Sequence, residues 1–306
     1  RSLRLTRSDT YRGDRTVQPA NVTFLIDYDD AYDQDPVQAL LEGNVDILTL
    51  PETLAQQAEE AGCGVLSLDD AVTGLLLNPR SEKLENRALR SLFLKTLHRE
   101  DLLSRRENPV EALGVMPPCV VWNGESYYGD GARIYTQEDS SAVEEIPSLL
   151  QELDLEEIPS ITVLCRDDPE SIAVANGFLV AWNQVLGNAF NLEPLQEGEL
   201  QARIASGSYE AALYTLRAGG TTPYDVLRSF ESTASPTLLE DETFDQTLRS
   251  LSFDLASYRE AETLLAECCV FYPIFQDATY YAVNPDTRGI TVAPDQSVDF
   301  TGARKK

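Results

Sequence analysis

The stretch from residue 160 to 216, SITVLCRDDPESIAVANGFLVAWNQVLGNAFNLEPLQEGELQARIASGSYEAALYTL, decides the fold class of this chain. Short strand-like runs alternate in it with segments of helical periodicity. We predict strands at 160–165, 190–195 and 209–216, and helices at 169–186 and 199–205. Strand and helix alternation of this kind is typical of an α/β sheet whose strands are joined by helical crossovers.

The residues on either side continue this mixed pattern. Residues 82–105 form one helix or two, and we expect Arg87, Arg90, Lys95 and Arg99 on the polar face. Residues 107–135 are rich in Pro and Gly and are expected to be mostly loop. The other predicted strands are 22–26, 45–50, 72–77, 268–275 and 279–283, and the other predicted helices are 37–42, 52–60, 141–152, 222–230, 243–252 and 257–266.

The first fifteen residues are basic and could be read as a nucleic-acid-binding arm. They contain Arg1, Arg4, Arg7, Arg12 and Arg15. These arginines alternate with Leu3, Leu5 and Tyr11, however, which favours a strand with one wet face.

The overall charge excludes several kinds of partner. Lys and Arg total 24 against 51 Asp and Glu, a formal net charge of −27. A phosphate backbone is bound through Lys and Arg, so a nucleic-acid partner is not expected. Anionic lipid is disfavoured for the same reason. No run of eighteen apolar residues predicts a membrane span, and no signal peptide is present. Since the chain begins with Arg, we expect that an amino-terminal segment has been removed.

The cysteines and the single histidine offer no metal site. Five Cys (63, 119, 165, 268 and 269) form no CxxC pair, and a structural zinc needs four closely spaced Cys or His ligands. Cys63, Cys119 and Cys165 fit buried thiols, and their low density argues against a disulfide framework. We therefore expect neither a metal nor another cofactor.

Catalytic motifs are missing as well. GxSxG, HExxH and GxxxxGK[ST] do not occur, and His98 is expected on a helix surface, away from any nucleophile. The segment 129–134, GDGARI, is read as a turn because it lacks the third Gly of a dinucleotide loop. The acids at 27, 29, 30, 33 and 35 fail the EF-hand pattern and favour a helix-capping turn over calcium binding. We expect that the protein is not an enzyme.

Several segments, in order, resemble one family: the bacterial extracellular solute-binding proteins of the oligopeptide and dipeptide class (family 5), which serve ABC importers. LTRSDTYRG at 5–13 resembles its L-x-R-N-x-x-Y-W-G, and ALLEGNVDI at 39–47 its A-L-x-x-G-E-V-D-I. LLN at 76–78 resembles x-F-N, SYEAAL at 208–213 resembles D-Y-D-A-A-L, and FYPIF at 271–275 resembles a closing strand. The match begins deep inside the family pattern, so the chain resembles its carboxyl-terminal lobe.

This resemblance implies a periplasmic-binding-protein-like α/β lobe of the class II, or cluster C, type, with a mixed sheet flanked by helices. The family traps an extended peptide between two lobes that close on it. By register we expect 1–20 to be crossover strands of the first lobe, 21–255 to be the second-lobe domain, and 256–306 to return to the first lobe. The register also gives the expected ligand-binding residues: Asn78, Tyr214, Leu216, Arg217, Gly219 and Tyr224.

The chain departs from the family at the ligand position. The family has W-x-A-D-Y-x-x-P, in which the Asp receives the ligand ammonium, whereas this chain has LRAGGTTP at 216–223. Leu216 thus stands for the Trp and Gly219 for the Asp. A buried ammonium that lost its carboxylate would cost about 3–5 kcal/mol. We therefore expect either a different ligand (anionic, amino-blocked, a sugar or a chelate) or loss of binding.

The resemblance also implies partners and a location. We expect a peptide or other small solute and ABC permease subunits as partners, an extracellular or periplasmic location, and a lipoprotein-type anchor outside this chain. A sensing or interaction module without transport is the alternative, and a hydrolase with an acid pair is a weaker one. If the first lobe is absent, the chain is expected to bind its ligand weakly and to self-associate.

Overall fold

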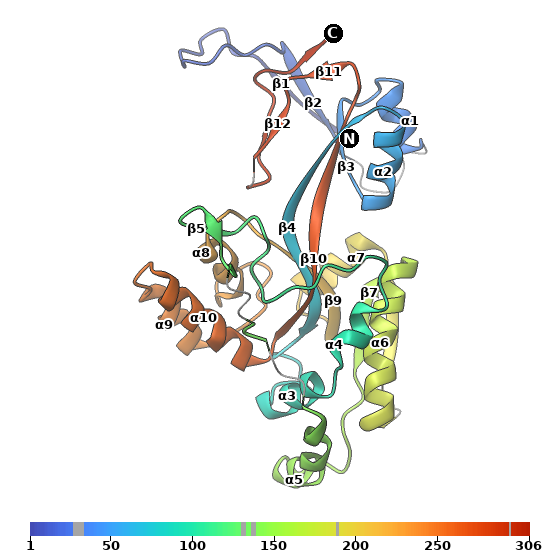
Figure 1. Ribbon diagram of the computed structural model, residues 1–306, viewed down its shortest axis with the longest axis vertical. Coiled ribbons are helices and arrows are strands. Elements are labelled where there is room, and N and C mark those ends of the chain that lie inside the picture. The colour runs from blue at the N-terminus through green and yellow to red at the C-terminus, as the bar shows by residue number, and fades with distance from the viewer. Residues whose placement is uncertain (27–33, 130–132, 136–138, 188–189, 294) are drawn as a thin grey trace. The chain divides into compact units, whose positions relative to one another are not determined.

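The computed structural model describes residues 1–26, 34–129, 133–135, 139–187, 190–293 and 295–306 (Figure 1). The chain divides into two compact units. Unit 1 comprises Arg1–Asp69 and Ala278–Lys306, and unit 2 comprises Asp70–Asp277. These boundaries differ from the divisions expected at 20/21 and 255/256, because they fall inside two long strands. The assignment of the segments to lobes stays a prediction.

The sheet of unit 2 is mixed, and the predicted α/β alternation is confirmed. The strand order of the whole six-stranded sheet is β3 (Ile47–Leu50, in unit 1), β10 (Phe271–Val283), β4 (Gly64–Leu77), β9 (Ala211–Arg217), β7 (Thr162–Arg166) and β8 (Asn191–Leu195). β7 pairs in parallel with β8 and β9, whereas β4 and β9 are antiparallel. The helices α6 (Pro169–Val185) and α7 (Glu197–Ala205) supply the crossovers that parallel neighbours need.

Helices flank this sheet, and several begin at the side-chain caps that the sequence offers. Asp168 accepts from Ser171 N at the start of α6, which packs along β7 and β8 (Figure 1). The remaining elements of unit 2 are α3 (Arg87–Lys95), α4 (Arg99–Leu103), the hairpin strands β5 (Val121–Trp122) and β6 (Glu125–Ser126), η1 (Ser140–Glu145), α5 (Ile146–Glu152), α8 (Pro223–Leu227), η2 (Arg228–Phe230), α9 (Glu242–Arg249) and α10 (Leu255–Cys268).

The core of unit 2 is aromatic where α3 meets α6. Trp182 is fully buried, and its ring centroid lies 5.1 Å from that of Phe93 and 5.3 Å from that of Phe190. Its indole N–H donates to the carbonyl of Phe93 over 2.9 Å. The tryptophan therefore contributes both apolar area and a satisfied hydrogen bond to this core.

Two arginines expected on a polar helix face are instead buried, so that prediction is wrong for them. Arg90 donates to the carbonyls of Leu84, Glu85 and Cys268, which ties α3 to the end of α10. Arg99 donates to the carbonyls of Ala112 and Pro273. Buried guanidinium groups are tolerated here because backbone oxygens satisfy their donors. His98 is exposed, as expected.

The two closing strands expected at 268–275 and 279–283 are one strand. Helix α10 runs to Cys268, Cys269 turns the chain with φ 54°, and β10 continues unbroken from Phe271 to Val283. The polar residues between its apolar runs do not end the strand because β10 pairs with β4 and also with β3. For the same reason β4 is longer than the predicted strand at 72–77.

Unit 1 has a small core of its own, which includes Leu40, Leu50, Ala55, Ala58 and Ala282. Its strands and helices are β1 (Ser2–Thr6), β2 (Asn21–Leu25), α1 (Pro36–Leu41), β3 (Ile47–Leu50), α2 (Glu52–Glu60), β11 (Thr287–Arg288), β12 (Thr291–Val292), β13 (Val298–Asp299) and β14 (Arg304–Lys305).

The first strand does not have one solvent-exposed and one buried face, as was expected. Among the described residues, β1 pairs with β2 alone in a two-stranded sheet, and all five residues of β1 are exposed. Phe24 of β2 meets the ring of Phe300 edge-on at 5.9 Å, but Leu3 and Leu5 of β1 are each 52% exposed.

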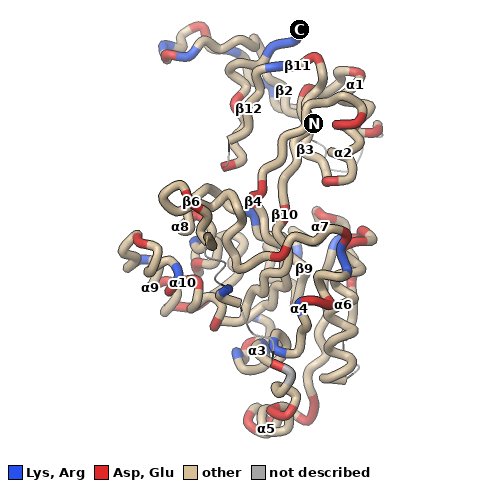
Figure 2. The backbone as a smooth tube through the Cα atoms, viewed as in Figure 1, with Lys and Arg blue, Asp and Glu red and all other residues tan. Residues whose placement is uncertain are grey.

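The cysteine thiols and the acidic side chains were also the subject of predictions. All five cysteines are free, and Cys119 is only partly buried. Asp35 caps α1 by accepting from Gln38 N, whereas the acids at 27–33 and residues 130–132 of the GDGARI segment lie outside the described residues. Asp and Glu are spread over both units (Figure 2). The described His, Cys, Asp and Glu side chains form no group that could hold a metal.

Candidate functional site

The loop at 218–222, which joins β9 to α8, is the candidate site. β9 is an interior strand of the sheet, between β4 and β7, and Ala211, Ala212, Leu213 and Leu216 are buried in it. The loop leaves the carboxyl end of this strand. In α/β sheets, ligands bind outside the carboxyl ends of the strands, so the loop stands where a ligand is expected.

Backbone and capping bonds hold the loop in place. Ala218 N–H donates to the carbonyl of Asp70 over 2.8 Å, and Val121 N–H donates to the carbonyl of Thr221 over 3.1 Å. At the start of α8, the carboxylate of Asp225 accepts from the Thr222 amide at 3.1 Å and from its hydroxyl at 2.6 Å. This capping box fixes the entry of the chain into α8.

The two glycines of the loop have different surroundings. A Cβ at Gly220 would collide with the carboxylate of Asp225, so a side chain there is incompatible with the capping box. Gly219 is exposed, and nothing lies within 4 Å of the Cβ that it lacks. A side chain therefore fits at Gly219 but not at Gly220.

Tyr214 and Leu216 lie on one face of β9, because side chains alternate along a strand. Leu216 is only 3% exposed, so it belongs to the core of unit 2. Tyr214 is half-buried, and its ring meets that of Phe271 edge-on at 6.4 Å. Burial raises the pKa of the Tyr214 phenol. Both residues thus support the strand that leads to the loop.

Arg217 lies on the opposite face of β9, where the structure adds a residue that the sequence analysis missed. The Arg217 guanidinium is half-exposed, and its Nη1 lies 3.6 Å from Oδ1 of Asp70, whose side chain is fully buried. Asp70 sits beside it because Ala71 pairs with Arg217 in the ladder. The only signal in the sequence is an acid directly before the apolar run of β4.

Tyr224 begins a row of aromatic rings. Its ring centroid lies 6.4 Å from that of Phe253, which lies 6.4 Å from Tyr258, which in turn lies 5.5 Å from Trp122. Phe253 is 66% exposed and has φ 54°, a conformation that bulky residues rarely adopt. Tyr224 was expected here by register alone, whereas the other three rings come from distant segments and were not predicted.

Asn78 is not brought to this loop. It follows β4 and is only 1% exposed; its side-chain N–H groups donate to the carbonyls of Gly207 and Tyr209, and its oxygen accepts from Arg80 N–H. Leu77 pairs with the first residue of β9, so Asn78 lies at the amino end of that strand. Of the six expected residues, the structure gathers Arg217, Gly219 and Tyr224 around the loop.

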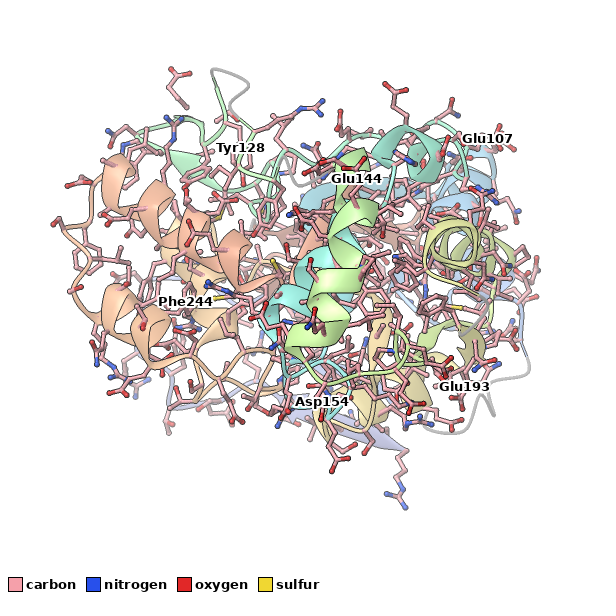
Figure 3. All side chains as sticks on the ribbon, turned by 90° about the horizontal axis from the view of Figure 1, so that it is seen from below. Glu107, Tyr128, Glu144, Asp154, Glu193 and Phe244 are labelled. Atoms are coloured by element: carbon pink, nitrogen blue, oxygen red, sulfur yellow. The ribbon has the colours of Figure 1, made fainter. Side chains whose placement is uncertain are left out.

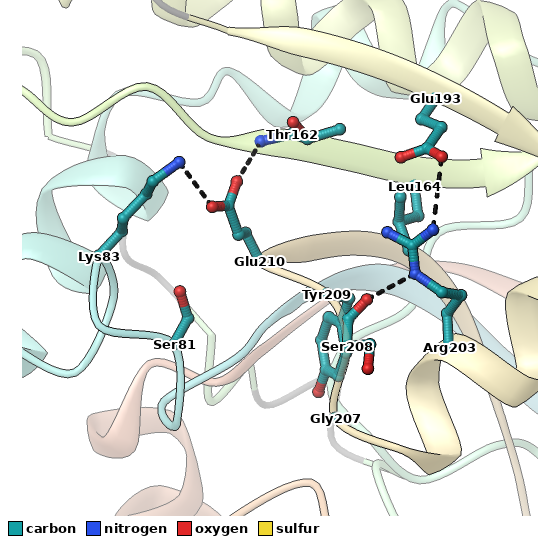
Figure 4. A pocket seen from close by; sticks show the side chains of 10 residues that line it. All are labelled: Ser81, Lys83, Thr162, Leu164, Glu193, Arg203, Gly207, Ser208, Tyr209 and Glu210. Carbon is teal, nitrogen blue, oxygen red and sulfur yellow. Dashed lines mark hydrogen bonds and ion pairs between the residues drawn. The ribbon is translucent and has the colours of Figure 1, made fainter.

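A separate polar pocket of about 420 Å³ lies near Asn78, at the amino ends of β7 and β9 (Figure 4). Its charged side chains already have partners. Lys83 lies 2.6 Å from Glu210, which also accepts from Thr162 N–H at 2.7 Å, while Arg203 donates to the Ser208 carbonyl at 2.7 Å and lies 3.4 Å from Glu193. This pocket therefore offers no unsatisfied charge to a ligand.

Comparisons with known proteins identify the fold. No family model matches the chain, and no curated protein does. Among solved structures, it is similar to the dipeptide binding protein from Pseudoalteromonas sp. SM9913 in complex with Met-Leu, with 17% identity and a TM-score of 0.74. It is also similar to the pheromone receptor PrgZ, with 18% identity and a TM-score of 0.71. The substrate-binding domain of an oligopeptide ABC transporter from Bacillus anthracis str. Ames follows at 15% and 0.69.

The alignments cover 100%, 100% and 99% of this chain, respectively, but 62% of each of the three matched chains. The chain thus spans about 62% of the length of these proteins. None of the helices in the described part of the chain combines the length and the apolar character that crossing a membrane requires. The chain has the fold of the peptide-binding, substrate-binding proteins of ABC transporters, over the part of their length that it spans.

Proposed function

We propose that this chain is part of the ligand-capturing component of an ABC importer for peptides or related small solutes. The observation that carries the proposal is a fold match over the whole chain to the peptide-binding pheromone receptor PrgZ and to a dipeptide binding protein. In this proposal the protein binds its ligand and does not catalyse a reaction. It is held outside the cell or in the periplasm by an anchor that lies beyond this chain, and it delivers its ligand to permease subunits.

The ligand is proposed to bind through something other than a free amino terminus. An ammonium needs a carboxylate, and the two carboxylates next to the loop are already engaged. Asp70 lies against Arg217, and Asp225 accepts both hydrogen bonds from Thr222. Gly219 adds no acid. The open space at Gly219 suits an amino-blocked group better, because such a group brings no charge that needs a partner.

The test uses the native gene product. Ligands that copurify with it are identified by mass spectrometry, and calorimetry then compares matched peptides with free and acetylated amino termini. Affinity that is unchanged or improved by acetylation supports the proposal. A loss of tenfold or more on acetylation would show that the amine is recognised.

Gly219→Asp is the matched variant, because an acid at this position has room. It is expected to shift preference toward the free amine without disturbing the capping box. If Gly219→Asp leaves the preference between the two peptide forms unchanged, the loop does not contact the ligand amino end.

A second function is favoured by the same engaged carboxylates: a sensing or interaction module that keeps the fold without transport. One structural neighbour, PrgZ, is itself a pheromone receptor. Uptake of the identified ligand by cells with and without the gene separates the two functions. Equal uptake would favour the sensing module.

A further inference from the structure

Glu262 is a fully buried acid on α10 for which the proposed function has no role. One carboxylate oxygen, Oε1, accepts from Val115 N–H at 3.0 Å and from the hydroxyl of Tyr128. Met116 N–H in turn donates to that same hydroxyl over 3.2 Å. Residues 115 and 128 are the two ends of a loop segment, so a single carboxyl group on α10 holds both ends.

The other half of this carboxyl group is unsatisfied. Among the described residues, Glu262 Oε2 and the buried hydroxyls of Tyr127 and Tyr135 make no hydrogen bond of good geometry, although the Tyr127 hydroxyl lies close enough to the carboxyl to lower its pKa. A carboxylate can only accept hydrogen bonds, whereas a protonated carboxyl also donates one. A proton on Oε2 gives this oxygen a donor within a cluster whose phenol oxygens can accept.

We infer that Glu262 is a buried proton-binding site, and that its neutral form clamps the segment 115–128 against α10. Loss of the proton leaves a charge inside the core of unit 2. Such a charge is relieved by water, which enters when the segment opens.

The surroundings of Glu262 support this assignment. Its titratable and charged neighbours are Tyr127 and Tyr128 on the segment, Tyr135 beyond it, and Arg259 on α10, with Cys268 and Cys269 next to Tyr135. Arg259 is the positive group among them, and it also donates to the carbonyl of Tyr127 over 3.4 Å. Burial raises the pKa of Glu262 to about 7, against the lowering effects of the hydrogen bonds from Tyr128 and Val115, of the Tyr127 hydroxyl and of the positive charge of Arg259.

The clamp is connected to the candidate site. Between its two ends the segment forms the hairpin β5–β6, and Val121 of this hairpin donates to Thr221 in the candidate loop. Trp122 packs against Tyr258 of α10 at 5.5 Å. Figure 3 shows Tyr128 in the same part of unit 2 as Phe244 of α9, which packs on α10. Glu262 is thus a positioning residue for the candidate loop at 218–222, a role that rests on the proposed function.

Amide hydrogen exchange between pH 6 and pH 8.5, corrected for the intrinsic effect of pH, tests the clamp. In the wild-type chain, peptides from 115–128 are expected to lose about tenfold in protection over this range, levelling off above pH 7. Glu262→Gln keeps the accepting oxygen but cannot ionise, so its protection should not change with pH. Glu260→Gln, on the exposed face of the same helix, should behave as wild type.

The same loss of protection in Glu262→Gln, or no loss in wild type, overturns the inference. If the Gln variant does not fold, the carboxyl ¹³C signal of Glu262 in wild type decides, and a titration midpoint below pH 5.5 is contrary to the inference. Tyr128→Phe removes a donor to the carboxylate and should raise that midpoint. None of these readouts involves a ligand, so their failure would leave the proposed function standing.

Discussion

The stability of unit 2 should depend on pH through Glu262 in a way that one substitution removes. Burial raises the pKa of this carboxyl from 4.5 to about 7. A group whose pKa is raised by folding stabilises the native state in its protonated form. That contribution is complete below pH 4.5, falls as pH rises through the window from 4.5 to about 7, and is lost above it.

The magnitude follows from the size of the shift. Each pKa unit corresponds to about 1.4 kcal/mol, so the unfolding free energy falls by about 3 kcal/mol across the whole pH window. Between pH 5 and pH 8 the expected loss is about 2 to 3 kcal/mol. Many other acids titrate near the lower end of this range. The informative quantity is therefore the difference in unfolding free energy between Glu262→Gln and wild type, compared at the two pH values.

Urea unfolding followed by tryptophan fluorescence measures this difference. The two tryptophans, Trp122 and Trp182, are both in unit 2, so the signal reports the unit that contains Glu262. Glu262→Gln is expected to gain about 2 to 3 kcal/mol on wild type between pH 5 and pH 8, whereas Glu260→Gln should gain nothing. The reasoning is refuted if the difference in unfolding free energy between Glu262→Gln and wild type is the same at both pH values, or if the Gln variant becomes less stable relative to wild type as pH rises.

Three further predictions concern other positions. Asn78→Ala leaves one buried and one partly buried carbonyl without donors and should cost about 3 kcal/mol in urea unfolding; a cost below about 0.5 kcal/mol would mean that these carbonyls do not depend on Asn78. Gly220→Ala should destabilise by about 1–3 kcal/mol because it collides with Asp225, whereas Gly219→Ala should be neutral, and equal thermal midpoints would contradict this contrast. Trp182→Phe should cost about 2 kcal/mol by circular dichroism, and an unchanged midpoint would contradict the packing argument.

The order of strands and helices could be predicted from the sequence because periodicity is a local property. The run from 160 to 216 gives its three strands and two helices within a few residues of their observed bounds. The resemblance by register predicted the fold, which the structural neighbours confirm, whereas the ligand-binding residues that it predicted stay a prediction. That Gly219 stands where the family has its Asp rests on the same register and stays a prediction.

What only the tertiary structure decided are the partners of charged groups. Arg90 and Arg99 have the spacing of surface residues, and backbone carbonyls of distant segments are what allow their burial. Asp70 lies beside Arg217 only because β4 and β9 pair in one register. Glu262 meets Val115 and Tyr128 across 147 and 134 residues of sequence. Local pattern fixes which residues become helix or strand, but desolvation and pairing depend on contacts that no short window of sequence contains.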